Sequence, residues 1–154
     1  MEFVEPIRSS RHIAQIKNTL RGANLIRDLL LFELWINSAL RISDLLSIKV
    51  SYLWNETGQM QDFFVIKEQK TKKNNKIYVT DSVKQTMQKY QDMYPHVIAK
   101  HDNYVFFSKR TKVYGTKQIT RKMAWIHINQ RCKEICSLKG NFWGHTLRKT
   151  RGYH

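Results

Sequence analysis

The chain has 154 residues, and its 27 Lys and Arg outnumber its 12 Asp and Glu, which gives a formal net charge of +15 with neutral His. This excess predicts a polyanionic partner, and nucleic acid is favoured over a membrane surface because no basic amphipathic helix with a clean apolar face is present. A hydrophobic content of 42% excludes a disordered basic tail. Without a long uncharged apolar run or a signal-peptide start, we expect a cytoplasmic protein and no membrane partner.

The first forty residues predict two helices. Ser9 or Ser10 is a candidate N-cap for a first helix that ends at Gly22. Asn24 is the candidate cap of a second helix over residues 25–39. This second helix has apolar residues on nearly every face, which predicts that it is buried at the centre of the domain. They are Leu29, Leu30, Phe32, Leu34 and Trp35.

The next forty residues are rich in strand signals, after a short turn over residues 44–46 that Ser43 caps. Together they predict a small antiparallel meander that ends in a β-hairpin. The expected segments are an extended segment at 49–54, a turn at 55–58, strands at 62–67 and 76–79, and a polar hairpin tip at 72–75.

The last part of the chain returns to helical patterns. A cap at Thr80 or Asp81 begins a helix that Pro95 ends, and an apolar, extended run at 104–107 precedes a basic loop at 109–117. A long helix and a shorter final helix follow. Helices around one small antiparallel sheet predict an α+β fold, mostly helical, in a single domain. The apolar positions of the long helix are Ile119, Met123, Ile126 and Ile135.

Two cysteines, Cys132 and Cys136, lie one helical turn apart. The favoured interpretation is a pair of small, reduced side chains in a cytoplasmic protein. His127 together with these cysteines would begin a metal site, but no fourth ligand lies at a zinc spacing. The sequence therefore predicts no metal site.

Three separate segments carry the residues that we single out for chemistry. Arg41 follows the most apolar helix and precedes Asp44 by three positions. Because burying a lone charge is costly, Arg41 either forms a structural ion pair with Asp44 or faces a ligand. Lys70 lies in a lysine-rich hairpin. His145 and Arg148 are three residues apart, on one side of the predicted final helix.

Together these side chains suit the binding of one phosphodiester group. An arginine binds two phosphate oxygens at once, a lysine donates a proton, and a histidine adds a hydrogen bond or relays a proton. Such a set stabilises the negatively charged transition state of phosphoryl transfer. A run of lysines is more often a solvated face, and that is the default interpretation for most lysines of the hairpin.

The same segments resemble the tyrosine recombinases, also called phage-type integrases, over nearly the whole chain. That family carries a Gly-Leu-Arg-Ile-Ser-Glu-Leu-like segment after a buried helix, a Lys on a β-hairpin, and His-x-Leu-Arg-His-Thr ahead of a nucleophilic Tyr. The similar segments here are residues 39–45, 68–71 and 145–150. Lys70 is the matching lysine, and Lys72 and Lys73 are alternatives.

The resemblance implies a site-specific DNA recombinase that integrates or excises a phage or other mobile element through a 3′-phosphotyrosyl intermediate. It implies that Arg41 and Arg148 hold the non-bridging phosphate oxygens. Lys70 would protonate the leaving 5′-oxygen, with His145 assisting proton transfer and Asp44 orienting Arg41. No cofactor is implied, neither metal nor nucleotide, because the covalent link conserves the bond energy. The implied partners are double-stranded DNA and further protomers, as a tetramer on DNA.

The sequence departs from the family pattern at several positions. Ala39 stands where Gly is usual, which is conservative if the backbone there is helical. Lys149 replaces a common His and Arg151 a common apolar residue, and both add positive charge. The residues expected to bind DNA are Lys67, Lys72, Lys73, Lys76, Lys149 and Arg151.

We expect residues 1–154 to be a catalytic-domain fragment, without the family's N-terminal DNA-clamping (core-binding) domain and without the tail that carries the nucleophilic Tyr. Tyr153 lies too close to Arg148 to be that nucleophile and is interpreted as a packing aromatic. The fragment alone is therefore expected to be inactive. Two other functions stay open, a type IB topoisomerase served by the same residues and a basic DNA-binding module with no chemistry.

Overall fold

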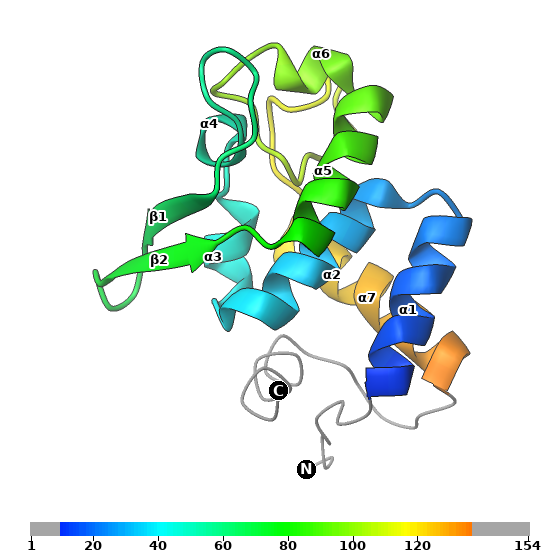
Figure 1. Ribbon diagram of the computed structural model, residues 1–154. Coiled ribbons are helices and arrows are strands. Elements are labelled where there is room, and N and C mark those ends of the chain that lie inside the picture. Colours follow the sequence, from blue (N-terminus) through cyan, green and yellow to red (C-terminus); the bar gives the residue numbers. More distant parts are fainter. Residues whose placement is uncertain (1–9, 137–154) are drawn as a thin grey trace. The chain divides into compact units, whose positions relative to one another are not determined.

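The computed structural model describes residues 10–136, with side chains from 13 to 130. Its helices and one two-stranded antiparallel sheet confirm the predicted α+β class (Figure 1). The chain divides into two compact units, the first from Met1–Ile42 and Arg121–His154 and the second from Ser43–Thr120. The predicted final helix lies outside the described residues.

Three helices pack together in the first unit (Figure 1): α1 (Ser10–Gly22), α2 (Ile26–Ser38) and α7 (Arg121–Cys136). The bounds of α1 and α2 agree with the sequence prediction to within a residue or two. Every residue of α2 from 26 to 35 is buried, as its all-round apolar pattern predicted. Apolar residues of the flanking helices are buried as well, namely Ile16 and Leu20 of α1 and Ala124 and Ile128 of α7.

Buried acidic side chains tie α2 to both neighbouring helices. Glu33 Oε2 lies 3.2 Å from Lys17 Nζ of α1. Asp28 Oδ1 lies 3.1 Å from Arg27 Nη2, and Asp28 Oδ2 lies 3.5 Å from His127 Nδ1 of α7. Burial by itself raises the pKa of Asp28, but the hydrogen bond with His127 and the charge of Arg27 outweigh it and hold that pKa below its ordinary value. Asp28 therefore joins α2 to α7 as a carboxylate.

The α2 helix ends at a residue with a left-handed backbone. Ala39 has φ 57° and ψ 20°, and its N–H donates to the Trp35 carbonyl. A Cβ atom is strained in this conformation, which glycine adopts freely. Alanine was expected to be a conservative replacement for glycine if the backbone here were right-handed helical. The backbone is left-handed, so the replacement is not conservative. The turn buries Leu40 and leads directly into α3 (Ile42–Leu46).

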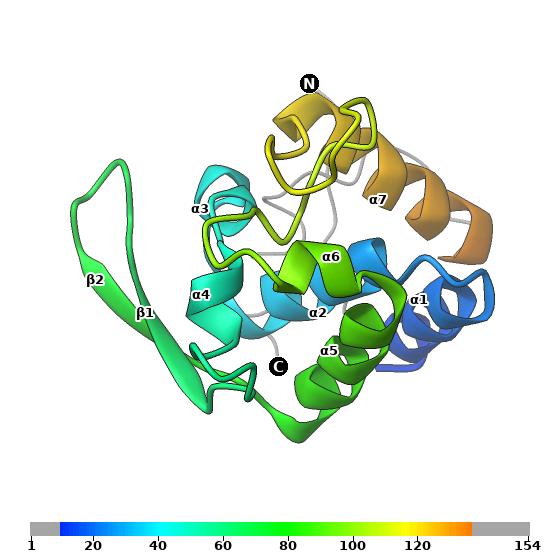
Figure 2. The same ribbon diagram turned by 90° about the horizontal axis from the view of Figure 1, so that it is seen from above.

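In the second unit the backbone after α3 forms short helices, one hairpin and one longer helix. The strands pair antiparallel, with Phe63 opposite Tyr78 and Lys67 opposite Asn74. Figures 1 and 2 show this hairpin projecting from the helices of its unit. The elements are α4 (Val50–Leu53), β1 (Phe63–Lys67), β2 (Asn74–Tyr78), α5 (Asp81–Met93) and α6 (Pro95–Ile98).

The core of the second unit is centred on Tyr90 of α5. Its hydroxyl donates to the Val105 carbonyl at 2.6 Å, and its ring packs against Trp54 and Phe107. The α5 helix begins as predicted, because the Thr80 side chain accepts a hydrogen bond from the Val83 N–H. Residues 105–107 thus form a buried segment that α5 holds by both apolar packing and a hydrogen bond.

Two predictions for this unit were wrong in detail. Residues 50–53 are not extended, because the N–H groups of Val50 and Ser51 donate to the carbonyls of Asn103 and His101 and the chain turns as α4, whereas Lys49 and Trp54 on either side are extended. The second hairpin strand starts at Asn74 rather than two residues later. At 50–53 backbone pairing with a distant loop overrides local strand propensity, and at Asn74 pairing with Lys67 extends the strand beyond its apolar residues.

The basic loop at 109–117 is held at both ends. The Ser108 N–H donates to the Lys117 carbonyl and the Tyr104 N–H to the Gly115 carbonyl, each at 2.8 Å. Tyr114 stacks on Phe107, with ring centroids 4.8 Å apart. Gly115 has φ 105°, and a Cβ there would lie 2.5 Å from the Asn103 side chain, so only glycine fits.

Replacing the strained alanine tests the account of the α2 end. Ala39→Gly is expected to raise the free energy of unfolding by about 1 kcal/mol, because glycine removes the left-handed strain. The measurement is urea denaturation followed by circular dichroism. The matched control is Ala14→Gly, at an exposed position within α1, which is expected to lower stability by about 1 kcal/mol. Destabilisation by both changes would contradict the assignment.

Acid is expected to weaken the first unit through Asp28. The folded state holds the pKa of this carboxyl below 3.8, so its contribution is fully present above the unfolded pKa and is lost as pH falls through the folded pKa. Stability measured by urea denaturation from pH 6 down to pH 2.5 should therefore decline more steeply in the wild type than in Asp28→Asn. The variant should itself be about 3 kcal/mol less stable at pH 7. Parallel declines in the two proteins would contradict the assignment.

Candidate active site

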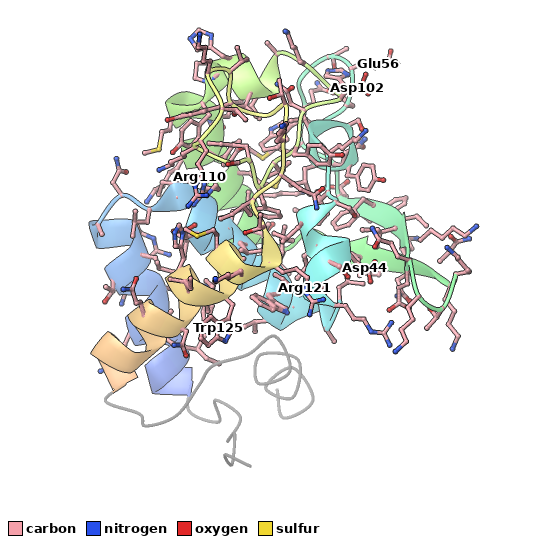
Figure 3. The ribbon with its side chains drawn as sticks, turned by 180° about the vertical axis from the view of Figure 1, so that it is seen from behind. Asp44, Glu56, Asp102, Arg110, Arg121 and Trp125 are labelled. Atoms are coloured by element: carbon pink, nitrogen blue, oxygen red, sulfur yellow. The ribbon has the colours of Figure 1, made fainter. Side chains whose placement is uncertain are left out.

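Asp44 joins α3 to the turn that carries Lys70. The Asp44 side chain is 1% exposed, and its Oδ1 accepts a hydrogen bond from the Gln69 N–H at 3.0 Å. Its Oδ2 is buried and has no hydrogen-bond partner within the part of the chain that the structure describes. Figure 3 shows Asp44 on α3, close to the hairpin. Because a buried carboxylate depends on its hydrogen bonds, this contact fixes the backbone next to Lys70.

The turn between the strands spans residues 68–73 and is closed by its own backbone. The Glu68 N–H donates to the Lys73 carbonyl at 2.8 Å, and the Lys72 N–H donates to the Glu68 carbonyl at 2.9 Å. The buried Glu68 side chain accepts a hydrogen bond from the Thr71 hydroxyl at 3.0 Å. The predicted tip at 72–75 was placed too far along the chain. Lys70 is thus exposed on an internally bonded turn.

The lysines predicted to bind DNA lie along this hairpin. Lys67 ends β1, Lys72 and Lys73 share the turn with Lys70, and all are exposed. Lys76 of β2 is exposed as well, but its ammonium group lies over aromatic rings rather than in open solvent. Its Nζ is 4.2 Å from the ring centroid of Phe63 and 5.2 Å from that of Tyr78. The hairpin therefore presents a row of positive charge.

Arg41 is half-buried and lies between the left-handed turn at Ala39 and the start of α3. It belongs to the first unit, whereas Asp44 and Lys70 belong to the second. Of the predicted site residues, the structure therefore brings together Asp44 and the turn that carries Lys70. The others, His145, Arg148, Lys149 and Arg151, lie outside the described residues, so the predicted convergence of the whole set stays a prediction.

His127 was considered as a metal ligand beside the two cysteines, whose side chains are outside the described part. Its Nδ1 instead lies close to both Asp28 and Arg27, in the buried group that joins α2 to α7. Within residues 13–130, no group of three or more His, Cys, Asp and Glu side chains is arranged to hold a metal ion. No helix among the described residues is long and apolar enough to cross a membrane.

Sequence reasoning missed the backbone role of Gln69 and the outward aromatic residues Phe63 and Tyr78. The amide of Gln69 left no signal, because any residue type supplies an N–H. The aromatic pair did leave one, since residues 63–66 are Phe-Phe-Val-Ile. A half-buried strand normally alternates apolar and polar residues, so an unbroken apolar run indicates apolar side chains on both faces.

The described residues form a mostly helical α+β fold in which a lysine-bearing hairpin follows a Leu-Arg-Ile-Ser-Asp segment. The phage integrase family matches residues 9–154. The "Probable integrase/recombinase YoeC" of Bacillus subtilis (strain 168) is 40% identical over 155 residues, covering all of this chain and 76% of that protein. The chain belongs to the phage integrase family, the tyrosine recombinases.

Solved structures with the same fold are far more distant in sequence. XerA recombinase superimposes with a TM-score of 0.71 at 14% identity, over 96% of this chain and 48% of that chain. Lambda integrase (residues 75–356) bound to DNA gives a TM-score of 0.64 at 15% identity, over 98% of this chain and 51% of that one. The chain thus spans about half the length of these solved relatives. At such identities the likeness establishes the fold alone.

Removing the Asp44 carboxylate should loosen the turn that carries Lys70. In Asp44→Ala the Gln69 amide is expected to exchange with solvent about tenfold faster, because a hydrogen bond to a charged group is lost. The measurement is native-state hydrogen exchange by NMR. Asp44→Asn keeps an oxygen acceptor and is the matched control, with protection close to that of the wild type. Unchanged Gln69 exchange in the alanine variant would show that the turn orders itself without Asp44.

Proposed function

We propose that this chain is the phosphate-activating part of a site-specific DNA recombinase, which cuts and rejoins duplex DNA to integrate or excise a mobile element such as a phage. The observation that carries the proposal is the lysine-bearing turn, whose backbone a buried carboxylate of α3 fixes next to Lys70. An exposed lysine on an anchored turn is suited to protonating a leaving oxygen at a defined place. Membership of the phage integrase family supports the same reaction class.

In the proposed reaction a tyrosine hydroxyl attacks the scissile phosphorus, the bond to the 5′-oxygen breaks, and a 3′-phosphotyrosyl link remains. Arg41 and Arg148 bind the two non-bridging oxygens and stabilise their growing negative charge. Lys70 donates a proton to the departing 5′-oxygen, and His145 assists proton transfer. A free 5′-hydroxyl of a second duplex then attacks the phosphotyrosine and restores the diester.

Asp44 has two roles in this proposal. It orients Arg41, which precedes it by three positions in the chain, and it fixes the backbone beside Lys70. Lys72 and Lys73 share that turn and are the alternative proton donors. The proposed partners are duplex DNA and further protomers, and the solved relatives include a lambda integrase tetramer bound to a Holliday junction.

Duplex binding should depend on the hairpin and on salt. Lys72→Ala/Lys73→Ala is expected to reduce the slope of log K against log salt by about 1.8, since each neutralised phosphate contributes roughly 0.9. The measurement is fluorescence anisotropy with a labelled duplex between 50 and 300 mM NaCl. Lys89→Ala/Lys100→Ala, at two exposed lysines away from the hairpin, is the control and should leave the slope unchanged. Equal effects of the two pairs would remove the hairpin from the interface.

Strand cleavage separates an enzyme from a DNA-binding module. On a nicked suicide substrate that carries the element's junction, the chain alone is expected to form no covalent adduct, because Tyr153 is too close to Arg148 in sequence to attack in line. Joined to its downstream sequence, the protein should form the adduct, and Arg41→Ala should slow it by about 100-fold or more. Denaturing gels measure both.

Arg21→Ala, at another arginine of the first unit, is the control and should cleave at the wild-type rate. An adduct from the chain alone that disappears in Tyr153→Phe would make Tyr153 the nucleophile. Cleavage that survives Arg41→Ala at the normal rate would contradict the proposed catalytic role. DNA binding without any cleavage by the joined protein would leave a basic DNA-binding module as the function.

A further inference from the structure

The outward face of the β1–β2 hairpin carries three large apolar side chains that are exposed among the described residues. The inward residues Phe64, Ile66 and Ile77 are buried, and Phe64 packs near Tyr52. The outward residues are much more exposed than these inward ones: the exposed fraction is 45% for Phe63, 54% for Val65 and 65% for Tyr78. Figures 1 and 2 show no other element of the second unit on the outer side of this hairpin. Exposed large apolar side chains on one face indicate a binding surface.

The two outward rings form a cross-strand pair. Phe63 lies opposite Tyr78 in the register of the strands, with ring centroids 6.3 Å apart. The ammonium group of Lys76 lies over both rings, within 4.2 Å and 5.2 Å of their centroids. Aromatic faces and a positive charge therefore occupy one small surface, which we name the ring platform and define as Phe63, Lys76 and Tyr78.

The positive charge around the ring platform favours a ligand that carries a negative charge. Lysines continue from the platform along the hairpin to its turn. Of the acids near the platform in the sequence, Asp62 is paired with Lys84, Asp81 interacts with the charge of the same lysine, and Glu68 is buried and bonded to Thr71. A second copy of the chain would bring the same lysines against one another, which opposes pairing of two platforms.

The rings identify the ligand more closely. Bases within an intact duplex are stacked on one another and cannot stack on protein side chains, whereas an unpaired base has a free face. One nucleotide can make both interactions, because its base stacks on the rings while its phosphate lies near Lys76. We propose that the ring platform binds an unpaired nucleotide of single-stranded DNA.

This inference rests on the proposed function, because moving a cut strand from one duplex to another requires its terminal bases to leave their first partners. A platform on the same hairpin as the lysine-bearing turn, at the opposite end of its strands, stabilises such bases while they are unpaired. The platform thus favours strand exchange, whereas the residues of the candidate active site favour cleavage.

The test compares single-stranded and duplex DNA. Fluorescence anisotropy with a labelled oligothymidylate and with a duplex of equal length is measured at one salt concentration. Phe63→Ala/Tyr78→Ala is expected to weaken the single-strand affinity at least tenfold and the duplex affinity less than twofold, because ring stacking is lost while the charges stay. Val65→Ala, on the same face without a ring, is the matched control and should change neither affinity twofold. Tyr78→Trp should keep single-strand binding.

Each other outcome overturns the inference. An unchanged oligothymidylate affinity in the double variant removes the rings from binding. Equal losses on both DNAs show a general effect of the hairpin rather than base stacking. Concentration-dependent self-association of the wild type that the double variant lacks would make the platform an interface between copies. A wild type that binds neither DNA would overturn the proposed function too, whereas normal duplex binding with ring-independent single-strand binding would overturn this inference alone.

Discussion

The hydrogen bond between the buried Asp44 carboxylate and the Gln69 amide fixes the position of the turn that carries Lys70. Two strands alone are marginally stable in water, so the position of their turn depends on what holds it. The apolar inner face of the hairpin packs against the rest of its unit, but hydrophobic packing is not directional and does not fix the position of one lysine. The hydrogen bond that the Gln69 N–H donates to Asp44, a residue with 1% exposure, is directional and does fix that position.

Four of the nine acidic side chains that the structure describes are buried. Among the described residues, Asp28 and Glu33 join helices of the first unit, while Asp44 and Glu68 fix the turn of the second. Each is buried and bonded to a specific partner. The positive excess of the composition, 27 Lys and Arg against 12 Asp and Glu, suits a polyanionic ligand.

Local patterns predicted what local physics determines. Helical periodicity, the cap at Thr80 and the stop at Pro95 gave α5 nearly to the residue, and the apolar content of α2 gave its burial. The segment at 50–53 escaped prediction because its N–H groups bond to a distant loop. The candidate site residues stay a prediction from residue types, and the amide of Gln69 could not be predicted that way, because only the folded backbone brings that amide to Asp44.

The closed loop at 109–117 is a segment of the second unit where changes of sequence have little effect on stability. Its ends are joined by backbone hydrogen bonds, and the stacked Tyr114 and Gly115 secure one side. The loop residues before Tyr114 can be exchanged, or residues added among them, at small entropic cost and without moving the buried segment at 105–107. This charged segment on a fixed base is therefore where the second unit tolerates changes of sequence and length with the least effect on its core.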